Sequence, residues 1–318
     1  MENYKNKKVL VTGGSGFIGA NLVRSLINQR AKVSLFLRPN SNTWRLNDIL
    51  NKTKVYQVDI ADGKAVSKAV EIIKPQIIFH LAAYGAYPTQ KELLPIIKTN
   101  ILGTTNLLEA TKNINYLSFI NTGTSSEYGF KTKPMKETDS LDPTFFYATT
   151  KAATSMIAKV FSQQFNKPII TLRPFSIYGD WEEPGRFIPT IITNCLINKP
   201  IKLVPGKQVR DFLYVEDVVK AYLIAGLRSD LKGEIFNIGS GKEYLVSQVA
   251  KKIVKLINKP VKVIVGAYKP RRWDTTSWQA DITKAKKILK WQPQFSLDAG
   301  LQKAINWYKR NLNYYENS

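Results

Sequence analysis

Residues that build metal and disulfide sites are almost missing from this sequence. It contains one cysteine, Cys195, and one histidine, His80, among 318 residues. A single cysteine excludes a disulfide framework and any multi-cysteine metal site, and a single histidine excludes a histidine-rich metal site. We therefore expect no resident metal ion.

Long apolar runs are missing as well. No stretch approaches the roughly 18 uninterrupted apolar residues of a membrane-spanning helix. The apolar run near the start of the chain is far too short for a signal peptide. We therefore expect a cytoplasmic protein that does not span a membrane.

Acidic residues are few compared with basic ones. The chain has 24 Asp and Glu against 47 Lys and Arg, and its net charge is +23. Because the basic residues are scattered rather than gathered in a patch, arm or repeat, we do not expect a nucleic-acid partner. The charge still favours a small polyanionic ligand, such as a nucleotide with two phosphates.

The composition that remains is that of an ordinary globular protein, with 44% apolar and 22% charged residues. Through the first 170 residues, apolar runs of strand type alternate with helical patterns, which indicates a parallel sheet covered on both faces. We expect strands at 7–12, 32–37, 54–60, 76–83 and 116–123, and helices at 17–28, 64–74 and about 89–112. The sequence thus predicts an α/β fold with a doubly wound parallel sheet of the Rossmann type.

After about residue 175 the alternation loosens. Proline and glycine cluster in 178–189 and 203–208, and helical patterns return in 215–226, 244–257 and 297–310. We expect a smaller C-terminal substrate lobe that is interleaved with the sheet domain. The dinucleotide-binding domain would comprise 1–175 and about 209–240, and the substrate lobe about 176–208 and 241–312.

A glycine-rich loop follows the first predicted strand. Gly13, Gly16 and Gly19 lie between this strand and the next helix, and Gly14, Gly16 and Gly19 also satisfy the pattern G-x-G-x-x-G. Glycines let the backbone approach a pyrophosphate closely, and the N–H groups that begin the helix bind its charge. This context predicts a dinucleotide site.

The residues after the second predicted strand bear on the choice of cofactor. An NAD site usually has an acidic residue there, whereas this chain has Leu37 followed by Arg38. A guanidinium binds a 2′-phosphate, so we favour NADP(H), with NAD(H) as the alternative if Arg38 is a plain loop residue and 40–42 serve the ribose. Asp59 is a candidate acceptor for the adenine amino group, or a helix cap.

Four polar residues form a candidate catalytic group. Tyr147 and Lys151 are four residues apart on a predicted helix, so the ammonium can lie beside the phenol and lower its pKa. Such a tyrosine can transfer a proton to a sugar oxygen, and Thr124, after the fifth strand, can contact the same oxygen. Asn100 can hold a water that relays protons, or it can be a polar residue of the helix surface.

The sequence resembles the extended short-chain dehydrogenase/reductase family, in its NAD-dependent epimerase/dehydratase branch. The resemblance covers nearly the whole chain, with the motifs in family order. They are TGGSGFIG (12–19), VDI (58–60), HLAA (80–83), NILGTTNLLEA (100–110), TGTSSEYG (122–129), YATTK (147–151), RPFSIYG (173–179), VRDFLYVEDV (209–218), FNIGSG (236–241) and RRWDTTSWQAD (271–281).

This resemblance implies a nucleotide-diphosphate sugar as substrate and specific residue roles. Thr124, Tyr147 and Lys151 would be the catalytic trio, with Lys151 also on the nicotinamide ribose. The motifs further imply cofactor contacts by Gly13, Gly16, Phe17, Ile18, Gly19, Arg38, Asp59, Ile60, Leu81, Ala82, Ala83, Tyr147 and Lys151. They imply substrate contacts by Thr124, Ser125, Ser126, Tyr147, Arg210 and Arg271, with Arg186 as a weaker candidate.

Departures from the family pattern reduce the number of reactions that we expect this protein to catalyse. Dehydratases of this branch have an acidic residue two places after the catalytic threonine, where this chain has Ser126 and Glu127 comes one place too late. Arg38 after Leu37 resembles the reductases that use NADP. We predict NADPH-dependent reduction of the 4-keto group of a 4-keto-6-deoxy nucleotide-diphosphate sugar, with an NAD-dependent nucleotide-sugar 4-epimerase as the alternative.

Two predicted helices, near 89–112 and 145–165, have apolar residues beyond one sheet-facing stripe. Among these residues are Leu93, Leu94, Ile157 and Phe161. In the family that the chain resembles, the equivalent helices pair across a two-fold axis as a four-helix bundle. We therefore expect an isologous homodimer.

Overall fold

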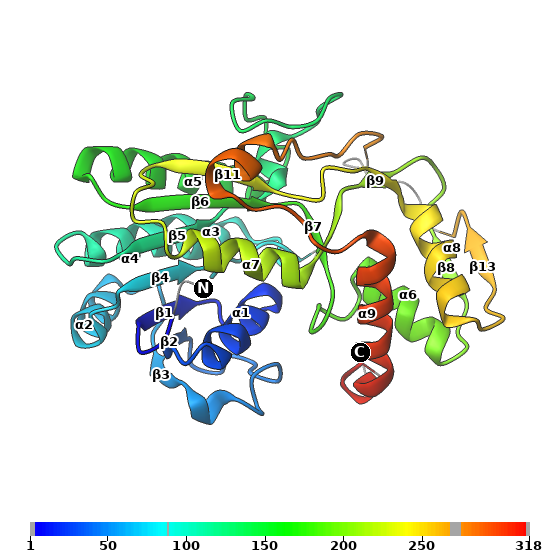
Figure 1. Ribbon diagram of the computed structural model, residues 1–318, viewed down its shortest axis with the longest axis horizontal. Coiled ribbons are helices and arrows are strands. Elements are labelled where there is room, and N and C mark those ends of the chain that lie inside the picture. Colours follow the sequence, from blue (N-terminus) through cyan, green and yellow to red (C-terminus); the bar gives the residue numbers. More distant parts are fainter. Residues whose placement is uncertain (1–3, 88, 268–274, 316–318) are drawn as a thin grey trace.

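A seven-stranded sheet forms the centre of the molecule (Figure 1). The computed structural model describes residues 4–87, 89–267 and 275–315. The strand order is β11-β6-β5-β4-β1-β2-β3, and every neighbouring pair is parallel. The strands are β1 (Lys8–Thr12), β2 (Lys32–Leu37), β3 (Lys54–Gln57), β4 (Ile77–His80), β5 (Ser118–Thr122), β6 (Ile169–Pro174) and β11 (Glu234–Ile238). The predicted doubly wound parallel sheet is confirmed.

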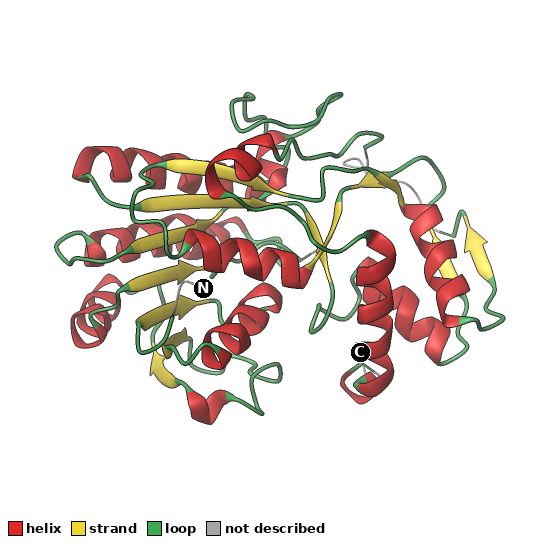
Figure 2. Ribbon diagram, viewed as in Figure 1, coloured by secondary structure: helices red, strands yellow, loops and turns green. Residues whose placement is uncertain are grey.

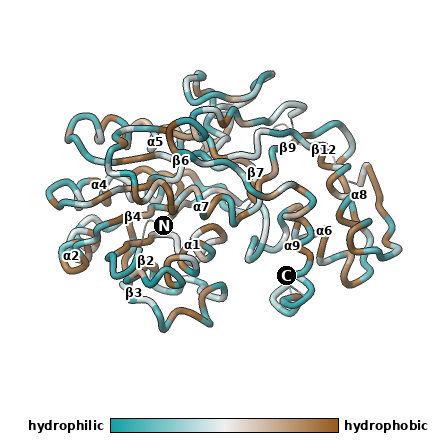
Figure 3. The backbone as a smooth tube through the Cα atoms, in the orientation of Figure 1, coloured by the Kyte–Doolittle hydropathy of each residue, from teal (hydrophilic) through white to brown (hydrophobic). Residues whose placement is uncertain are grey.

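Both faces of the sheet are covered, because its central strands are apolar on both sides. Side chains alternate between the two faces along a strand, so Val9 and Val11 of β1 belong to one core cluster and Leu10 to the other. One face is covered by α1 (Phe17–Asn28) and α7 (Val215–Ala225), and the other by α2 (Gly63–Ile73), α4 (Gly103–Thr111) and α5 (Phe146–Phe165). Figure 3 shows hydrophobic residues running through the interior and mostly hydrophilic loops around it.

The predicted helix at 89–112 begins later than expected. The structure has α3 (Leu93–Ile97), a π-helical turn, η2 (Lys98–Leu102), and then α4. A start at Thr89 would place Pro95 in the helix interior, where its ring and missing N–H break the hydrogen-bond ladder. With the start at Leu93, Pro95 lies in the first turn, where no intrahelical partner is lost.

Apart from α7 and β11, the elements after β6 form small paired strands and a helical layer. In Figure 2 this layer lies to one side of the central sheet. Parallel pairs are formed by β7 (Ser176–Tyr178) with β10 (Phe212–Tyr214) and by β8 (Ile201–Leu203) with β13 (Val263–Val265), and an antiparallel pair by β9 (Val209–Arg210) with β12 (Tyr244–Leu245). The helices of this layer are α6 (Phe187–Leu196), α8 (Val246–Ile257) and α9 (Leu297–Arg310), with shorter turns η4 (Ala285–Leu289) and η5 (Leu312–Tyr314). The turns η1 (Leu50–Lys52) and η3 (Ser125–Tyr128) belong to the part of the chain before β6.

The only cysteine of the sequence lies in the core between these helices. Cys195 of α6 is fully buried, and burial raises the pKa of its thiol to about 11.

Within residues 4–87, 89–267 and 275–315, none of the helices has the length and apolarity needed to cross a membrane. The residue boundaries of the two domains remain a proposal.

The single histidine is buried where β4 ends. His80 is 0% exposed; its Nδ1 lies 2.7 Å from Thr12 Oγ1 and its Nε2 lies 2.9 Å from Thr104 Oγ1. Burial, with the charge of Lys151, lowers the pKa of His80 from 6.5 to about 3. Below pH 6.5 the unfolded chain therefore binds a proton that the folded protein excludes, so stability falls as the pH drops from 6.5 toward 3.

We expect the ring of His80 to remain neutral throughout the stable pH range of the protein. A sample without an affinity tag has one histidine, so its ring proton signal in NMR is assigned without ambiguity. The chemical shift of this signal should stay constant between about pH 8 and pH 5. Titration with a midpoint near 6.5 would contradict the buried placement.

Candidate active site

The loop between β1 and α1 leaves no room for side chains at two of its glycines. Gly13 has a φ of +70°, and a Cβ there would lie 2.5 Å from the backbone nitrogen of Ala82. A Cβ at Gly19 would overlap the carbonyl oxygen of Gly13. The phosphate loop, residues 13–19, is thus packed closely against the loop that follows β4, and both positions require glycine.

The N-terminus of α1 is open to an anion. Gly16 is the N-cap, and the described residues place no side-chain cap and no acidic residue in the first turn, which begins with Phe17 and Ile18. Free N–H groups at a helix N-terminus bind phosphate, and the helix dipole adds to the attraction. Leu81 and Ala82 are half-buried and Ala83 is exposed in the neighbouring loop. These residues fit the pyrophosphate of a dinucleotide.

At the carboxyl end of β2, Leu37 stands where NAD-binding sites usually have a carboxylate, and a cation follows it. Leu37 is buried at 6% exposure, and Arg38, the next residue, is exposed. After β3, the carboxylate of Asp59 accepts a hydrogen bond of 2.9 Å from the backbone N–H of Ala61. It is not a helix cap, because Asp62 caps α2 and accepts from the N–H groups of Lys64 and Ala65. Ile60 is buried. The geometry therefore leaves Arg38 available to a ligand at this edge.

Thr124 and Tyr147 come together from two elements. Thr124 caps η3, directly after β5, and Tyr147 lies in the first turn of α5. The side chain of Thr124 is close enough to lower the pKa of Tyr147. Lys151, one turn further along α5, is 1% exposed. The loop after β5 and the first turn of α5 therefore bring two members of the predicted trio near each other, with the third on the same helix.

Burial dominates the protonation of this group. It raises the pKa of Tyr147 to about 12, an effect increased by the charge of Glu127 and opposed by the charge of Arg186. Burial also lowers the pKa of Lys151 to about 8, against the charge of Glu127. The sequence predicts that Lys151 lowers the pKa of Tyr147. In the structure desolvation outweighs any such effect, and the cation that lowers this pKa is Arg186.

The carboxylate of Glu127 is bound inside the protein. It is 0% exposed, and its Oε2 lies 2.7 Å from Nε of Arg173 on β6. Its Oε1 accepts hydrogen bonds from the backbone N–H of Thr124 at 2.8 Å and from the hydroxyl of Ser155 at 2.9 Å. Sequence reasoning missed this ion pair, although an arginine inside an apolar strand could have signalled a buried partner. Glu127 thus fixes the position of Thr124.

Asn100 holds two elements together. It is 1% exposed, so the helix-surface alternative is wrong. Its Nδ2 donates to the carbonyl of Tyr84 at 2.9 Å and to the hydroxyl of Thr150 at 2.8 Å, and its Oδ1 accepts from the N–H of Tyr84 at 2.8 Å. Protein groups therefore use both amide hydrogens, and only the carbonyl oxygen retains capacity for a water.

The predicted substrate residues are spread over several loops. Arg186 donates to the carbonyl of Ala86 at 2.9 Å and lies 4.6 Å from the ring centroid of Tyr87. Arg210 of β9 is half-buried and lies 5.7 Å from the ring centroid of Trp278.

The remaining predicted substrate contacts are Arg271 and two serines. Arg271 lies outside the described residues, so the structure does not place it beside Arg210. Ser125 is buried at 4% exposure and Ser126 is half-buried, both in η3. The predicted substrate site is therefore placed only in part.

A family model matches residues 9–239, and its description is the NAD-dependent epimerase/dehydratase family. The chain belongs to this family. The match includes the phosphate loop, Thr124, Tyr147 and Lys151, and it confirms the resemblance seen in the sequence. Enzymes of this family modify nucleotide sugars, and the family depends on NAD(P).

Similar proteins include epimerases and dehydratases. A UDP-glucuronate 4-epimerase of Thermodesulfobacterium geofontis is 32% identical, over 95% of this chain and 96% of the relative. The crystal structure of a UDP-glucose 4-epimerase of Thermotoga maritima with UDP-glucose has a TM-score of 0.88 and 29% identity, over 96% of this chain and 99% of that one. A dTDP-glucose 4,6-dehydratase of Bacillus anthracis in complex with NAD has a TM-score of 0.87 and 28% identity, over 98% and 99%.

Proposed function

We propose that this protein is an NADPH-dependent reductase of the 4-keto group of a 4-keto-6-deoxy nucleotide-diphosphate sugar. The observation that carries the proposal is the end of β2, where the buried Leu37 replaces the usual carboxylate and the exposed Arg38 follows it. Ser126 stands where the dehydratases have an acidic residue, and Glu127 is committed to Arg173. These features argue against elimination of water. The cytoplasm remains the proposed location.

The site residues support a reduction. When bound, the reduced nicotinamide supplies a hydride to the keto carbon, and residues 13–19, Arg38 and Lys151 would hold this cofactor. Tyr147, with a pKa near 12, is protonated at neutral pH and can donate its proton to the oxygen that becomes an alkoxide. Thr124, which lies near Tyr147, can donate to the same developing charge. The phenol therefore starts in the protonation state that a reduction needs.

The substrate diphosphate has candidate partners in the arginines. We assign Arg210 and Arg271 to the pyrophosphate of the sugar nucleotide, because planar guanidinium groups bind phosphate in a bidentate manner. Arg186 is close enough to Tyr147 to lower its pKa, so it lies near the reacting end of the site. A nucleotide-sugar substrate suits the net charge of +23.

A nucleotide-sugar 4-epimerase with NAD is the second candidate. It is favoured by the similarity to a UDP-glucuronate 4-epimerase and a UDP-glucose 4-epimerase over nearly the whole chain. An epimerase would use the same trio, and Tyr147 would first accept a proton from the sugar hydroxyl. Such an enzyme keeps its NAD through each turnover.

The cofactor experiment separates the two candidates. We expect NADPH to bind about tenfold to a hundredfold more tightly than NADH, the scale of a charge-assisted contact to a phosphate. Arg38→Ala should remove most of this preference and leave NADH binding nearly unchanged. Titration of protein fluorescence with each cofactor gives the two dissociation constants. Arg30→Ala is the matched control, since it removes an arginine at the other end of β2.

The contrary result is equally clear. Purified protein that retains NAD, and that consumes no added NADPH with any nucleotide-keto-sugar, would overturn the reductase assignment and favour the epimerase. Product identification after incubation with a panel of such sugars also identifies the base and the sugar.

We further propose a homodimer that pairs α3 to α4 and α5 with the same helices of a second copy. Leu94 is 60% exposed on α3, and Met156 and Val160 are 60% and 57% exposed on α5. Phe161, one of the predicted interface residues, is instead buried at 7% because it faces the sheet core and packs against the tilted ring of Phe165. Exposed apolar residues on adjacent helices favour an interface.

Light scattering at micromolar concentration should give twice the chain mass. Leu94→Glu combined with Met156→Glu should shift the protein to monomers, because charges would be buried without partners at the two-fold axis. Ile72→Glu is the control, since Ile72 is also 58% exposed but lies on α2. A monomeric wild-type protein would contradict the proposal.

A further inference from the structure

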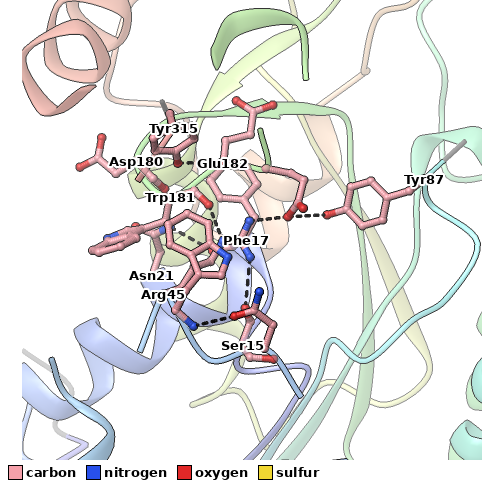
Figure 4. Close-up of polar contacts among 12 residues, drawn as sticks. Ser15, Phe17, Asn21, Arg45, Tyr87, Asp180, Trp181, Glu182 and Tyr315 are labelled. Carbon is pink, nitrogen blue, oxygen red and sulfur yellow. Dashed lines mark hydrogen bonds and ion pairs between the residues drawn. The ribbon is translucent and has the colours of Figure 1, made fainter. Parts of the chain in front are cut away.

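Three loops meet above the phosphate loop, and their contacts join the two sides of the sheet crevice (Figure 4). Arg45 lies in the segment after β2, Tyr87 in the segment after β4, and Glu183 between β7 and α6. Nη2 of Arg45 forms an ion pair with Oε2 of Glu183, and the hydroxyl of Tyr87 donates to the same oxygen at 3.4 Å. Glu183 therefore bridges Arg45 and Tyr87.

The position of this bridge matters because of the strand order. In the order β2-β1-β4, the direction of winding reverses between β1 and β4. Dinucleotides bind in the crevice beyond the carboxyl ends of the strands at such a reversal. Arg45 approaches from the β2 side and Tyr87 from the β4 side, so the contact through Glu183 spans the crevice.

Arg45 is the fixed half of the bridge. Its side chain is 5% exposed and its guanidinium lies 4.3 Å from the ring centroid of Trp44. Its Nε donates to the carbonyl of Trp181 at 2.7 Å, and its Nη1 to the carbonyl of Ser15, inside the phosphate loop, at 3.4 Å. Breaking the contact with Glu183 would leave Arg45 in place.

Glu183 belongs to the half that can move. Its side chain is 36% exposed, and Gly185, two residues further, is exposed, with a φ of +81° and open space around its Cβ position. On the other side, Trp181 is held by aromatic contacts with Trp44 and Trp307. The hydroxyl of Tyr315 donates to the carbonyl of Glu182 at 2.7 Å. The turn at 183–185 is thus exposed beyond a firmly packed anchor.

We propose that Arg45, Glu183 and Tyr87 form a clasp that closes over the bound dinucleotide and sets its rate of release. Opening the clasp breaks the two contacts of Glu183 while Arg45 stays attached to Trp181. These three are positioning residues rather than catalytic ones. The inference rests on the dinucleotide site of the proposed function, but it holds for either the reductase or the epimerase.

The release rate tests the clasp directly. NADPH or NADH bound to the full-length protein is displaced by excess oxidised cofactor in a stopped-flow instrument, and nicotinamide fluorescence reports its release. Glu183→Ala should raise the release rate about tenfold, the scale of one lost charge-assisted hydrogen bond. Glu183→Gln keeps one acceptor oxygen without the charge and should give a smaller increase. Asp230→Asn is the control, because it breaks the exposed pair of Arg228 and Asp230.

Simple electrostatics predicts the opposite sign. Removing the negative charge of Glu183 near the cofactor phosphates would slow release if charge alone controlled it. A release rate that is slower, or unchanged within about twofold, in Glu183→Ala would therefore overturn the clasp. A protein that binds neither cofactor would overturn both the clasp and the proposed function. No sugar is present in this measurement, so an incorrect substrate leaves its result intact.

Discussion

Tyr147→Phe should lower kcat by at least about a hundredfold, the usual scale for loss of a general acid. The substitution removes the phenolic oxygen and retains the ring, which stacks on Phe145 at 6.3 Å between centroids. Because Tyr147 has a pKa near 12, its proton is present throughout the neutral range. Activity should be measured with the identified nucleotide-keto-sugar, and cofactor affinity should change little.

Thr149→Val is a suitable control for this experiment. Thr149 is exposed on the same turn of α5, where its hydroxyl bonds only to the carbonyl of Phe145 among the described residues. Its variant should retain near-normal turnover. Near-normal turnover in Tyr147→Phe would show that the proton comes from another group, and the mechanism proposed above would then be wrong.

Arg173→Met should destabilise the protein by about 3–5 kcal/mol, the range for breaking a buried ion pair by removal of one partner. Arg173 is 2% exposed and Glu127 0%, so the carboxylate would remain buried without its counterion. Burial already raises the pKa of Glu127, and Arg173 opposes this effect. Chemical denaturation should therefore show a large loss of stability at neutral pH.

A second substitution separates charge from packing. Arg173→Met combined with Glu127→Gln removes both charges and should recover part of the lost stability, because no unpaired carboxylate is left. Arg228→Met, which breaks an exposed pair, should change stability by less than about 1 kcal/mol. Equal losses in the single and double variants would mean that packing, rather than the buried charge, dominates.

The sequence predicts the sheet well because its strands are apolar and because the glycines that follow the first strand mark the phosphate loop. The run that ends at Thr12 is followed by the phosphate loop, and the geometry at Gly13 and Gly19 shows why no other residue fits. Helix boundaries are predicted less accurately. The helix starts as late as Leu93 because of Pro95, and the apolar pattern alone does not predict this start.

The candidate site is predictable only where its residues are local in sequence. Tyr147 and Lys151 share one helix, and Thr124 ends a strand. Arg45 and Glu183 are 138 positions apart, and nothing near either residue indicates the other. The inward direction of Glu127 depends on the fold of η3. The pKa of Tyr147 likewise depends on desolvation, which spacing along a helix does not reveal.

The buried position of Cys195 makes the chain convenient for chemical labelling. A thiol that is fully buried and has a pKa near 11 reacts slowly with maleimides at neutral pH. A cysteine introduced at the exposed position Lys91, in the segment after β4, would therefore take up a fluorophore selectively in an otherwise natural protein. A second dye on the cofactor would then report the distance across the crevice in single molecules as the cofactor arrives and leaves.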